Sequence, residues 1–152
     1  MNPQAAQNYL RTKVLTATPE QLQLMLFDGA LRFGEQARVA LNSQNYEQSF
    51  LLITRTQKIV NELLCTLKHE IAPDLCPKLA ALYSYAYRKL VEANINHKIE
   101  PLDEAINVLR FQRETWVMLM DKLAKQKAGI AAQKIDVPLP DSRMEATISL
   151  QS

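Results

Sequence analysis

The sequence predicts an all-α protein, an antiparallel up-and-down four-helix bundle with a short N-terminal cap segment and a mobile C-terminal tail. The 152 residues include only three glycines, while long segments repeat apolar residues at intervals of three and four. Turn-forming residues interrupt these segments briefly, and short connections make consecutive helices antiparallel neighbours. We therefore expect a cap segment over 1–17, a bundle domain over 18–127 and a disordered tail over 128–152.

The first long helix is expected from about Pro19 to Leu41, and its start is well marked. Thr18 is a suitable N-cap because Gln21, three positions later, can complete a capping box. Pro19 occupies the first helical position, where no amide hydrogen is needed. The local sequence is therefore sufficient to predict where this helix begins.

The same helix is apolar over an arc of roughly 200°, about twice what a bundle helix needs. The arc contains Leu22, Leu24, Leu26, Phe27, Ala30, Leu31, Phe33, Ala37 and Leu41, and Met25 lies beyond it. Gly29 and Gly34 each cost about 1 kcal/mol relative to alanine, which suggests that another backbone or a bulky side chain approaches there. Two interpretations stay open: neighbouring segments bury the arc, or part of it is a groove for a partner helix.

Three further helices are expected over about 46–69, 77–96 and 101–127. The second has apolar residues near a 3.5-residue spacing, at Tyr46, Phe50, Ile53, Val60, Leu64 and Leu67. The core face of the third contains Leu79, Leu82, Tyr83, Ala86, Leu90 and Ala93. Tyr85 points away from that face, either as part of a binding surface or as a surface tyrosine lying over its own helix.

Three polar residues fall where the helical patterns predict burial: Gln57, Asn94 and Arg113. A buried arginine must be paired, and the candidate partners of Arg113 are Glu62, Glu92 and Glu114. Such a network would fix the register of the helices, because no nucleophile or base accompanies it.

The composition argues against several classes of function. Eighteen basic and sixteen acidic residues give a charge of +2, too small and too evenly spread to favour nucleic acid or a membrane surface. No signal peptide or membrane-spanning run is visible, so we expect a cytoplasmic protein with no membrane insertion. Cys65 and Cys76 are expected to be reduced and to serve in packing.

The sequence also lacks the motifs of enzymes and metal sites. Cys65 and His69 lie one helical turn apart, but no second Cys/His pair completes a metal site. No phosphate-binding loop, nucleophile elbow or dinucleotide motif occurs. We therefore expect no metal, no cofactor and no enzymatic activity.

Several motifs occur in a defined order. They are Asn2-Pro3, Tyr9 five positions before Val14, TATPEQLQLMLFDGAL from Thr16 to Leu31, Gln57 with Ile59, Glu62 and Leu63, LYSYAYRKLVEANI from Leu82 to Ile95, and Leu102-Asp103-Glu104 with Arg113-Glu-Thr-Trp116. In order and spacing, about residues 2–120 resemble the FliS family of flagellin-specific export chaperones.

The resemblance implies a cytoplasmic helical bundle that binds the disordered C-terminal helical region of newly made flagellin. The client becomes helical in apolar grooves, which prevents premature polymerisation and keeps it ready for the flagellar type III export gate, a further partner. In this family the N-terminal segment can cover part of the groove and be displaced by client. The implied partner-binding residues are Tyr9, Val14, Leu24, Met25, Phe27, Asp28, Tyr85, Arg88, Asn94 and Ile95.

The chain departs from the family pattern at three positions. Gln4 replaces a frequent tyrosine, and Ser84 and Lys98 replace frequent aspartates. Lys98 removes the expected N-cap of the fourth helix, which changes that turn and bears on client preference. The free protein is expected to be a monomer or a homodimer. The alternative functions are a self-associating bundle without a client and a metal-dependent helical enzyme.

Overall fold

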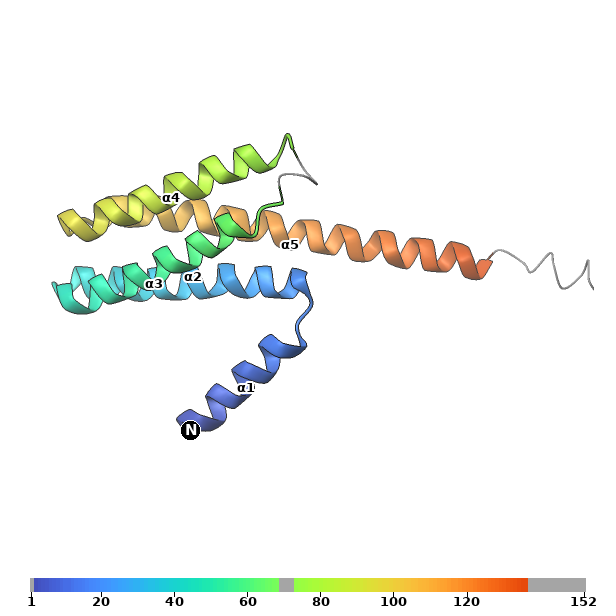
Figure 1. The fold of residues 1–152 in the computed structure, drawn as a ribbon, viewed down its shortest axis with the longest axis horizontal. Coiled ribbons are helices and arrows are strands. Elements are labelled where there is room, and N and C mark those ends of the chain that lie inside the picture. The colour runs from blue at the N-terminus through green and yellow to red at the C-terminus, as the bar shows by residue number, and fades with distance from the viewer. Residues whose placement is uncertain (1, 69–72, 137–152) are drawn as a thin grey trace, which may run out of the picture. The chain divides into compact units, whose positions relative to one another are not determined.

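The computed structural model describes residues 2–68 and 73–136, and helices are the only regular secondary structure of these residues, as predicted (Figure 1). The helices are α1 (Pro3–Thr16), α2 (Pro19–Asn42), α3 (Tyr46–Cys65), α4 (Cys76–Asn96) and α5 (Ile99–Asp136). The described residues divide into two compact units within α5, between Val117 and Met118.

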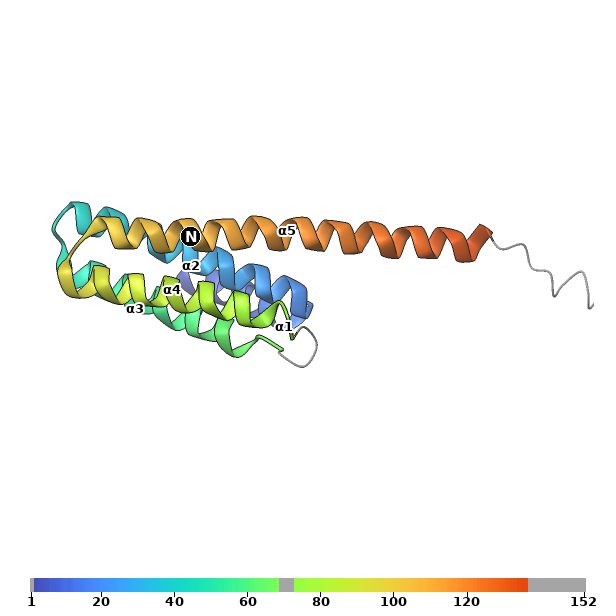
Figure 2. The ribbon, with the colours of Figure 1, turned by 90° about the horizontal axis from the view of Figure 1, so that it is seen from above.

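Helix α5 continues further than predicted (Figure 2). The predicted helix ended near Lys127 and the disordered tail began at 128, but residues 128–136 are helical. Gly129 does not end the helix, because neighbouring alanine, lysine and glutamine residues favour helix and offset its cost of about 1 kcal/mol. The rest of the predicted tail, 137–152, lies outside the described residues.

The N-terminal segment is also helical, which the sequence analysis did not predict. The Asn2 side chain accepts a hydrogen bond from the Gln4 amide at 3.1 Å, and Pro3 occupies the first helical position. None of the residues of α1 is buried. The cap residue and proline were a usable signal, but the sparse apolar residues of this segment concealed it.

The predicted start of α2 is confirmed. The Thr18 hydroxyl accepts from the Gln21 amide at 3.2 Å, and the Gln21 side-chain oxygen accepts from the Thr18 amide at 3.0 Å. These two bonds satisfy amides that the first turn of a helix leaves without partners.

The predicted close approaches at the two glycines of α2 are confirmed. A Cβ atom at Gly29 would lie 3.3 Å from Ile59 of α3, and one at Gly34 would lie 3.1 Å from Ile106 of α5. Each glycine therefore removes the side chain that would hold a neighbouring helix away. The excess apolar arc of α2 is covered largely by these neighbours, with Met25 half-buried.

Consecutive helices of the bundle are antiparallel, as the contacts between them show. From the start of α2 onward, Gln23 accepts a hydrogen bond from Thr66, and Phe33 lies under the Arg55 guanidinium, so α3 is antiparallel to α2. Tyr46, the first residue of α3, stacks on His97 just after α4, with ring centroids 4.1 Å apart. Helix α4 is therefore antiparallel to α3.

One core contains residues from α2, α3, α4 and α5. Its buried members are Phe27, Ala30, Ala37, Ala40, Leu41, Leu52, Ile53, Val60, Leu63, Tyr83, Ala86, Leu90, Ala93, Leu102, Ala105, Ile106 and Leu109. The alanines let the helix backbones approach closely, and the larger side chains fill the space between them.

The apolar residues that the sequence places at a 3.5-residue spacing on α3 are only partly buried. Tyr46 and Phe50 are exposed, whereas the small polar residues Ser49 and Thr56 are buried. Packing of α3 against α2 and α4 decides which side of its apolar stripe is covered, so the buried face is rotated from the expected one. Leu82 of α4 was also predicted in the core and is exposed.

The buried hydroxyls of α3 have partners on their own helix. Ser49 donates to the Tyr46 carbonyl at 3.1 Å, and Thr56 donates to the Leu52 carbonyl at 2.9 Å. Burial of these groups therefore leaves no polar atom unsatisfied.

We predict that Gly34→Leu lowers the free energy of unfolding by about 1–3 kcal/mol, because a side chain there displaces Ile106 and separates α2 from α5. Urea unfolding followed by circular dichroism measures the change. Gly129→Leu is the matched control, since no atom of the described chain lies within 4 Å of a Cβ at Gly129. Equal effects at the two glycines would contradict this account.

A second prediction concerns alkaline pH. Burial raises the pKa of Tyr83 from 10.0 to about 12, so the neutral phenol is favoured in the folded state. This contribution is complete below pH 10 and is lost as pH rises through about 12. Between pH 8 and 11, wild type should lose about 1 kcal/mol more stability than Tyr83→Phe in urea unfolding. Parallel losses in both proteins would show that Tyr83 does not titrate in this way.

Candidate partner-binding surface

The four predicted partner residues on α2 lie in different environments. Leu24 and Met25 are half-buried and Asp28 is exposed, but Phe27 is only 2% exposed and lies in the core. The Phe27 ring packs against Tyr83 of α4, with centroids 6.4 Å apart. Phe27 therefore supports the surface from inside, and replacing it would disturb the core before it tested a groove.

The predicted residues on α4 are more accessible. Ile95 is 70% exposed, Tyr85 and Arg88 are also exposed, and Asn94 is half-buried. Ile95 is thus an apolar side chain that a partner could cover without rearrangement of the core. Helix α4 therefore has the apolar side chain of Ile95 and the basic side chain of Arg88 on its accessible surface.

Tyr85 is tied to α5 through its polar tip. Its hydroxyl donates to Glu104 at 3.1 Å, and the Lys89 ammonium lies 5.6 Å from the ring centroid. Lys89 pairs with both Glu104 and Glu92 at 3.2 Å. The hydrogen bond to Glu104 makes the largest contribution to raising the pKa of Lys89, and the bond to Glu92 makes the next largest. The outward direction predicted for Tyr85 is confirmed, and its role in binding stays a prediction.

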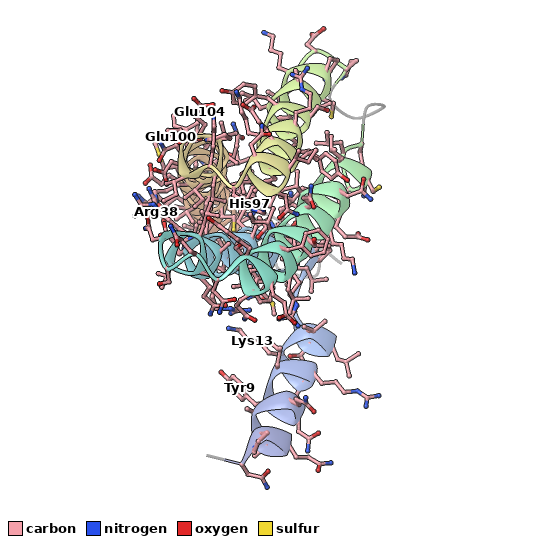
Figure 3. The ribbon with its side chains drawn as sticks, turned by 90° about the vertical axis from the view of Figure 1, so that its left-hand side faces the viewer. Tyr9, Lys13, Arg38, His97, Glu100 and Glu104 are labelled. Carbon is pink, nitrogen blue, oxygen red and sulfur yellow. The ribbon has the colours of Figure 1, made fainter. Side chains whose placement is uncertain are left out.

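The two predicted residues on α1 are exposed. Tyr9 is 70% exposed and projects from the helix together with Lys13, and Val14 is exposed as well (Figure 3). Leu10 and Leu15, which were not in the predicted set, are also exposed. Helix α1 therefore presents several apolar side chains that no residue of the described chain buries.

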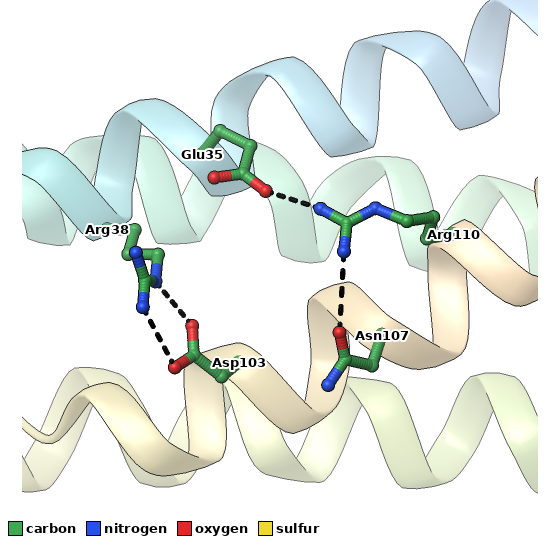
Figure 4. A network of polar contacts seen from close by, with 5 residues as sticks. All are labelled: Glu35, Arg38, Asp103, Asn107 and Arg110. Atoms are coloured by element: carbon green, nitrogen blue, oxygen red, sulfur yellow. Dashed lines mark hydrogen bonds and ion pairs between the residues drawn. The ribbon is translucent and has the colours of Figure 1, made fainter.

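Ion pairs connect α2 with α5 (Figure 4). Arg38 donates twice to Asp103, at 2.6 and 3.3 Å, which raises the pKa of Arg38. Arg110 donates to Glu35 at 2.7 Å and to Asn107 at 3.5 Å. Residue numbers rise along α2 as they fall along α5, so the two helices are antiparallel and these contacts define their register.

A third pair corrects the prediction for Arg113. This arginine is paired, as predicted, but with Asp28 at 2.5 Å and not with Glu62, Glu92 or Glu114. Antiparallel packing of α5 on α2 brings the two residues together from distant parts of the sequence. Asp28, a predicted partner residue, therefore already has a partner within the chain.

Trp116 connects α5 to the first turn of α2. Its indole nitrogen donates to the Glu20 carbonyl at 3.1 Å, and its ring packs against the core. Trp116 is the only tryptophan in the sequence. Its fluorescence therefore reports on the region where α2 begins, close to Leu24 and Met25.

Three exposed residues of the bundle differ from what the sequence predicts. Val39 and Phe111 are large, exposed apolar residues on α2 and α5. Their positions outside the core-facing stripes were the available signal. Cys76 is buried, but Cys65 is exposed and so does not serve in packing as predicted.

The described residues contain no cluster of three His, Cys, Asp or Glu side chains that could hold a metal ion. His69, considered with Cys65 as a ligand pair, lies outside the described residues. None of the described helices is long and apolar enough to cross a membrane.

A helical bundle that exposes large apolar side chains on several helices is typical of proteins that bind other proteins. The model of the family described as Flagellar protein FliS matches residues 1–123. The flagellar secretion chaperone FliS of Bacillus subtilis is 34% identical over 128 residues, covering 84% of this chain and 93% of that protein. This chain belongs to the FliS family of flagellar secretion chaperones.

Other comparisons agree with this assignment. The FliS chaperone of Escherichia coli is 30% identical over 112 residues, covering 73% of this chain and 82% of that protein. A solved bacterial flagellar chaperone has the same fold, with a TM-score of 0.64 at 18% identity, over 78% of this chain and 97% of that one. The comparisons support the chaperone interpretation and give no support to a self-associating bundle without a client.

Proposed function

We propose that this protein binds the C-terminal helical region of flagellin in the cytoplasm, prevents its premature polymerisation and delivers it to the flagellar type III export apparatus. The observation that carries the proposal is the family match over residues 1–123, which includes the bundle and every predicted partner residue. Size-exclusion chromatography after co-expression with a C-terminal flagellin fragment tests it. Independent elution of the two proteins at micromolar concentrations would refute it.

The physical basis of the proposal is the cost of folding the client. A disordered segment that becomes helical on binding loses conformational entropy, so it needs a large apolar receiving surface. On the proposed client side, Ile95 of α4 is exposed and Leu24 and Met25 of α2 are half-buried, while the core remains closed. An amphipathic client helix could cover these side chains without unfolding the chaperone.

The accessible members of the predicted set form the proposed client surface. On α2 these are Leu24 and Met25, and on α4 they are Tyr85, Arg88, Asn94 and Ile95. The apolar members would supply buried area, and Arg88 would orient an acidic group of the client. Phe27 and Asp28 would act indirectly, through core packing and the ion pair with Arg113.

We propose that α1 competes with the client. Tyr9 and Val14 are apolar and exposed on a helix with no buried residue, so they are suited to cover an apolar surface temporarily. If α1 covers the client surface in some molecules, only the remaining molecules can bind client. The apparent affinity for the client is then the intrinsic affinity multiplied by the fraction of molecules whose client surface is uncovered.

We predict that Met25→Glu and Ile95→Glu each weaken flagellin binding by about tenfold or more, because each places a charge where an apolar contact is expected. Trp116 fluorescence during titration with a tryptophan-free fragment provides the measurement, and circular dichroism checks the fold. Val39→Glu, another exposed apolar residue of α2, is the control. Unchanged affinity in both test variants would place the client surface elsewhere.

We also predict that deletion of residues 2–16 increases flagellin affinity by several-fold, because it removes the competing helix. Isothermal titration of the fragment against the full-length and shortened proteins measures the change. The double substitution Tyr9→Ser/Val14→Ser should reproduce it without shortening the chain. Weaker binding by both altered proteins would mean that α1 contacts the client directly.

A further inference from the structure

The last part of α5 extends past the region shared with the family. The family model ends at residue 123, but the helix continues to Asp136. Residues 118–136 belong to the second compact unit, and most of their described side chains are exposed. Leu119, Lys122 and Leu123 lie at the end of the family match, and residues 124–136 lie beyond it.

Large apolar side chains form a narrow seam along this part of the helix. Leu119, Leu123 and Ile130 are 43%, 40% and 54% exposed, and they are separated by four and seven residues. At about 100° per residue, the three positions lie within about 40° of one another on the helix. This is the a/d spacing of a coiled-coil seam, in which Leu123 and Ile130 take a positions and Leu119 takes a d position. The d position between Leu123 and Ile130 is the polar residue Gln126.

Lysines flank the seam on both sides. Lys122 takes a g position and Lys127 an e position, which are the positions that meet the flanking residues of a partner helix. The other described lysine of this unit, Lys125, lies on the opposite face and pairs with Asp121 at 3.1 Å. The charge bordering the seam is therefore positive.

This charge pattern discriminates between possible occupants. In a parallel pair with a second copy, Lys122 would face Lys127, which places like charges together. In an antiparallel pair, Lys122 would face a g position and Lys127 an e position of the other copy, and none of these positions between 115 and 129 is acidic. The chain's own α1 has no acidic residue and contains Arg11 and Lys13. Neither a second copy nor α1 complements the lysines.

An anionic membrane is also a poorer fit. Interfacial helices bury a wide apolar face rich in large side chains, whereas this seam is the narrow a/d type and Met118 and Ile130 lie on different sides of the helix. We propose that the Leu119–Ile130 seam of α5 is a docking surface for an acidic amphipathic helix of another protein, with apolar a and d residues and Glu or Asp at the flanking positions.

The test uses the full chain and two synthetic helical peptides that share leucine and isoleucine at a and d. One peptide has Glu at every e and g position, and the other has Lys. Isothermal titration should show at least about tenfold tighter binding of the acidic peptide, with the advantage decreasing as salt rises. Equal binding of both peptides, or binding of neither at about 1 mM, would overturn the proposal.

Charge reversal provides the decisive variant. The double substitution Lys122→Glu/Lys127→Glu should make the protein prefer the Lys peptide. The matched control is Lys125→Glu, which changes charge two residues from Lys127 but on the opposite face, and it should keep the preference for the acidic peptide. Loss of preference in the control alone, or no reversal in the double variant, would refute the assigned face.

Further measurements separate the other occupants. Sedimentation tests for a dimer, and vesicles containing phosphatidylserine test for membrane binding. A dimer that Leu123→Ser abolishes would overturn the proposal. Vesicle binding stronger than acidic-peptide binding would overturn it as well. Flagellin-fragment binding should be the same in the charge-reversed protein and in wild type, so failure of this proposal is distinguishable from failure of the client proposal.

Discussion

The close packing of α2 between α3 and α5 is the constraint on which the bundle depends. Gly29 admits Ile59 from one neighbour, and Gly34 admits Ile106 from the other. Because interiors are packed at near-crystalline density, a side chain at either glycine would press on the isoleucine that fills the space beside it. The core residues of four helices can meet only at this spacing, and the excess apolar arc of α2 is largely explained by its two neighbours.

Ion pairs on the bundle surface fix how far α5 is shifted along α2. The pairs from Arg38, Arg110 and Arg113 to acidic residues all join α2 to α5. Exposed ion pairs contribute little to stability, but a helix shifted along its neighbour would lose all three together. Register therefore comes from a set of individually weak contacts, while stability comes from the core beneath them.

The division between core and surface residues explains how a chaperone of this family can bind a client and stay folded. Phe27 is committed to the core, whereas Ile95 and the apolar side chains of α1 are not. The surface left after core packing is the proposed client surface, and most side chains of residues 118–133 are exposed as well. Two exposed surfaces on separate units could serve two partners without sharing residues.

The all-α class and the capping box at Thr18 could be predicted from the amino-acid sequence alone, because periodicity and capping act locally. Gly29 and Gly34 indicated close approaches on α2, but not which residues approach there. Tertiary structure decided that Phe27 is closed inside the core and that Arg113 pairs with Asp28, 85 residues away. The rotated face of α3 likewise depended on its neighbours. Local patterns show which side chains need partners, but only the packing of distant helices decides which partners they meet.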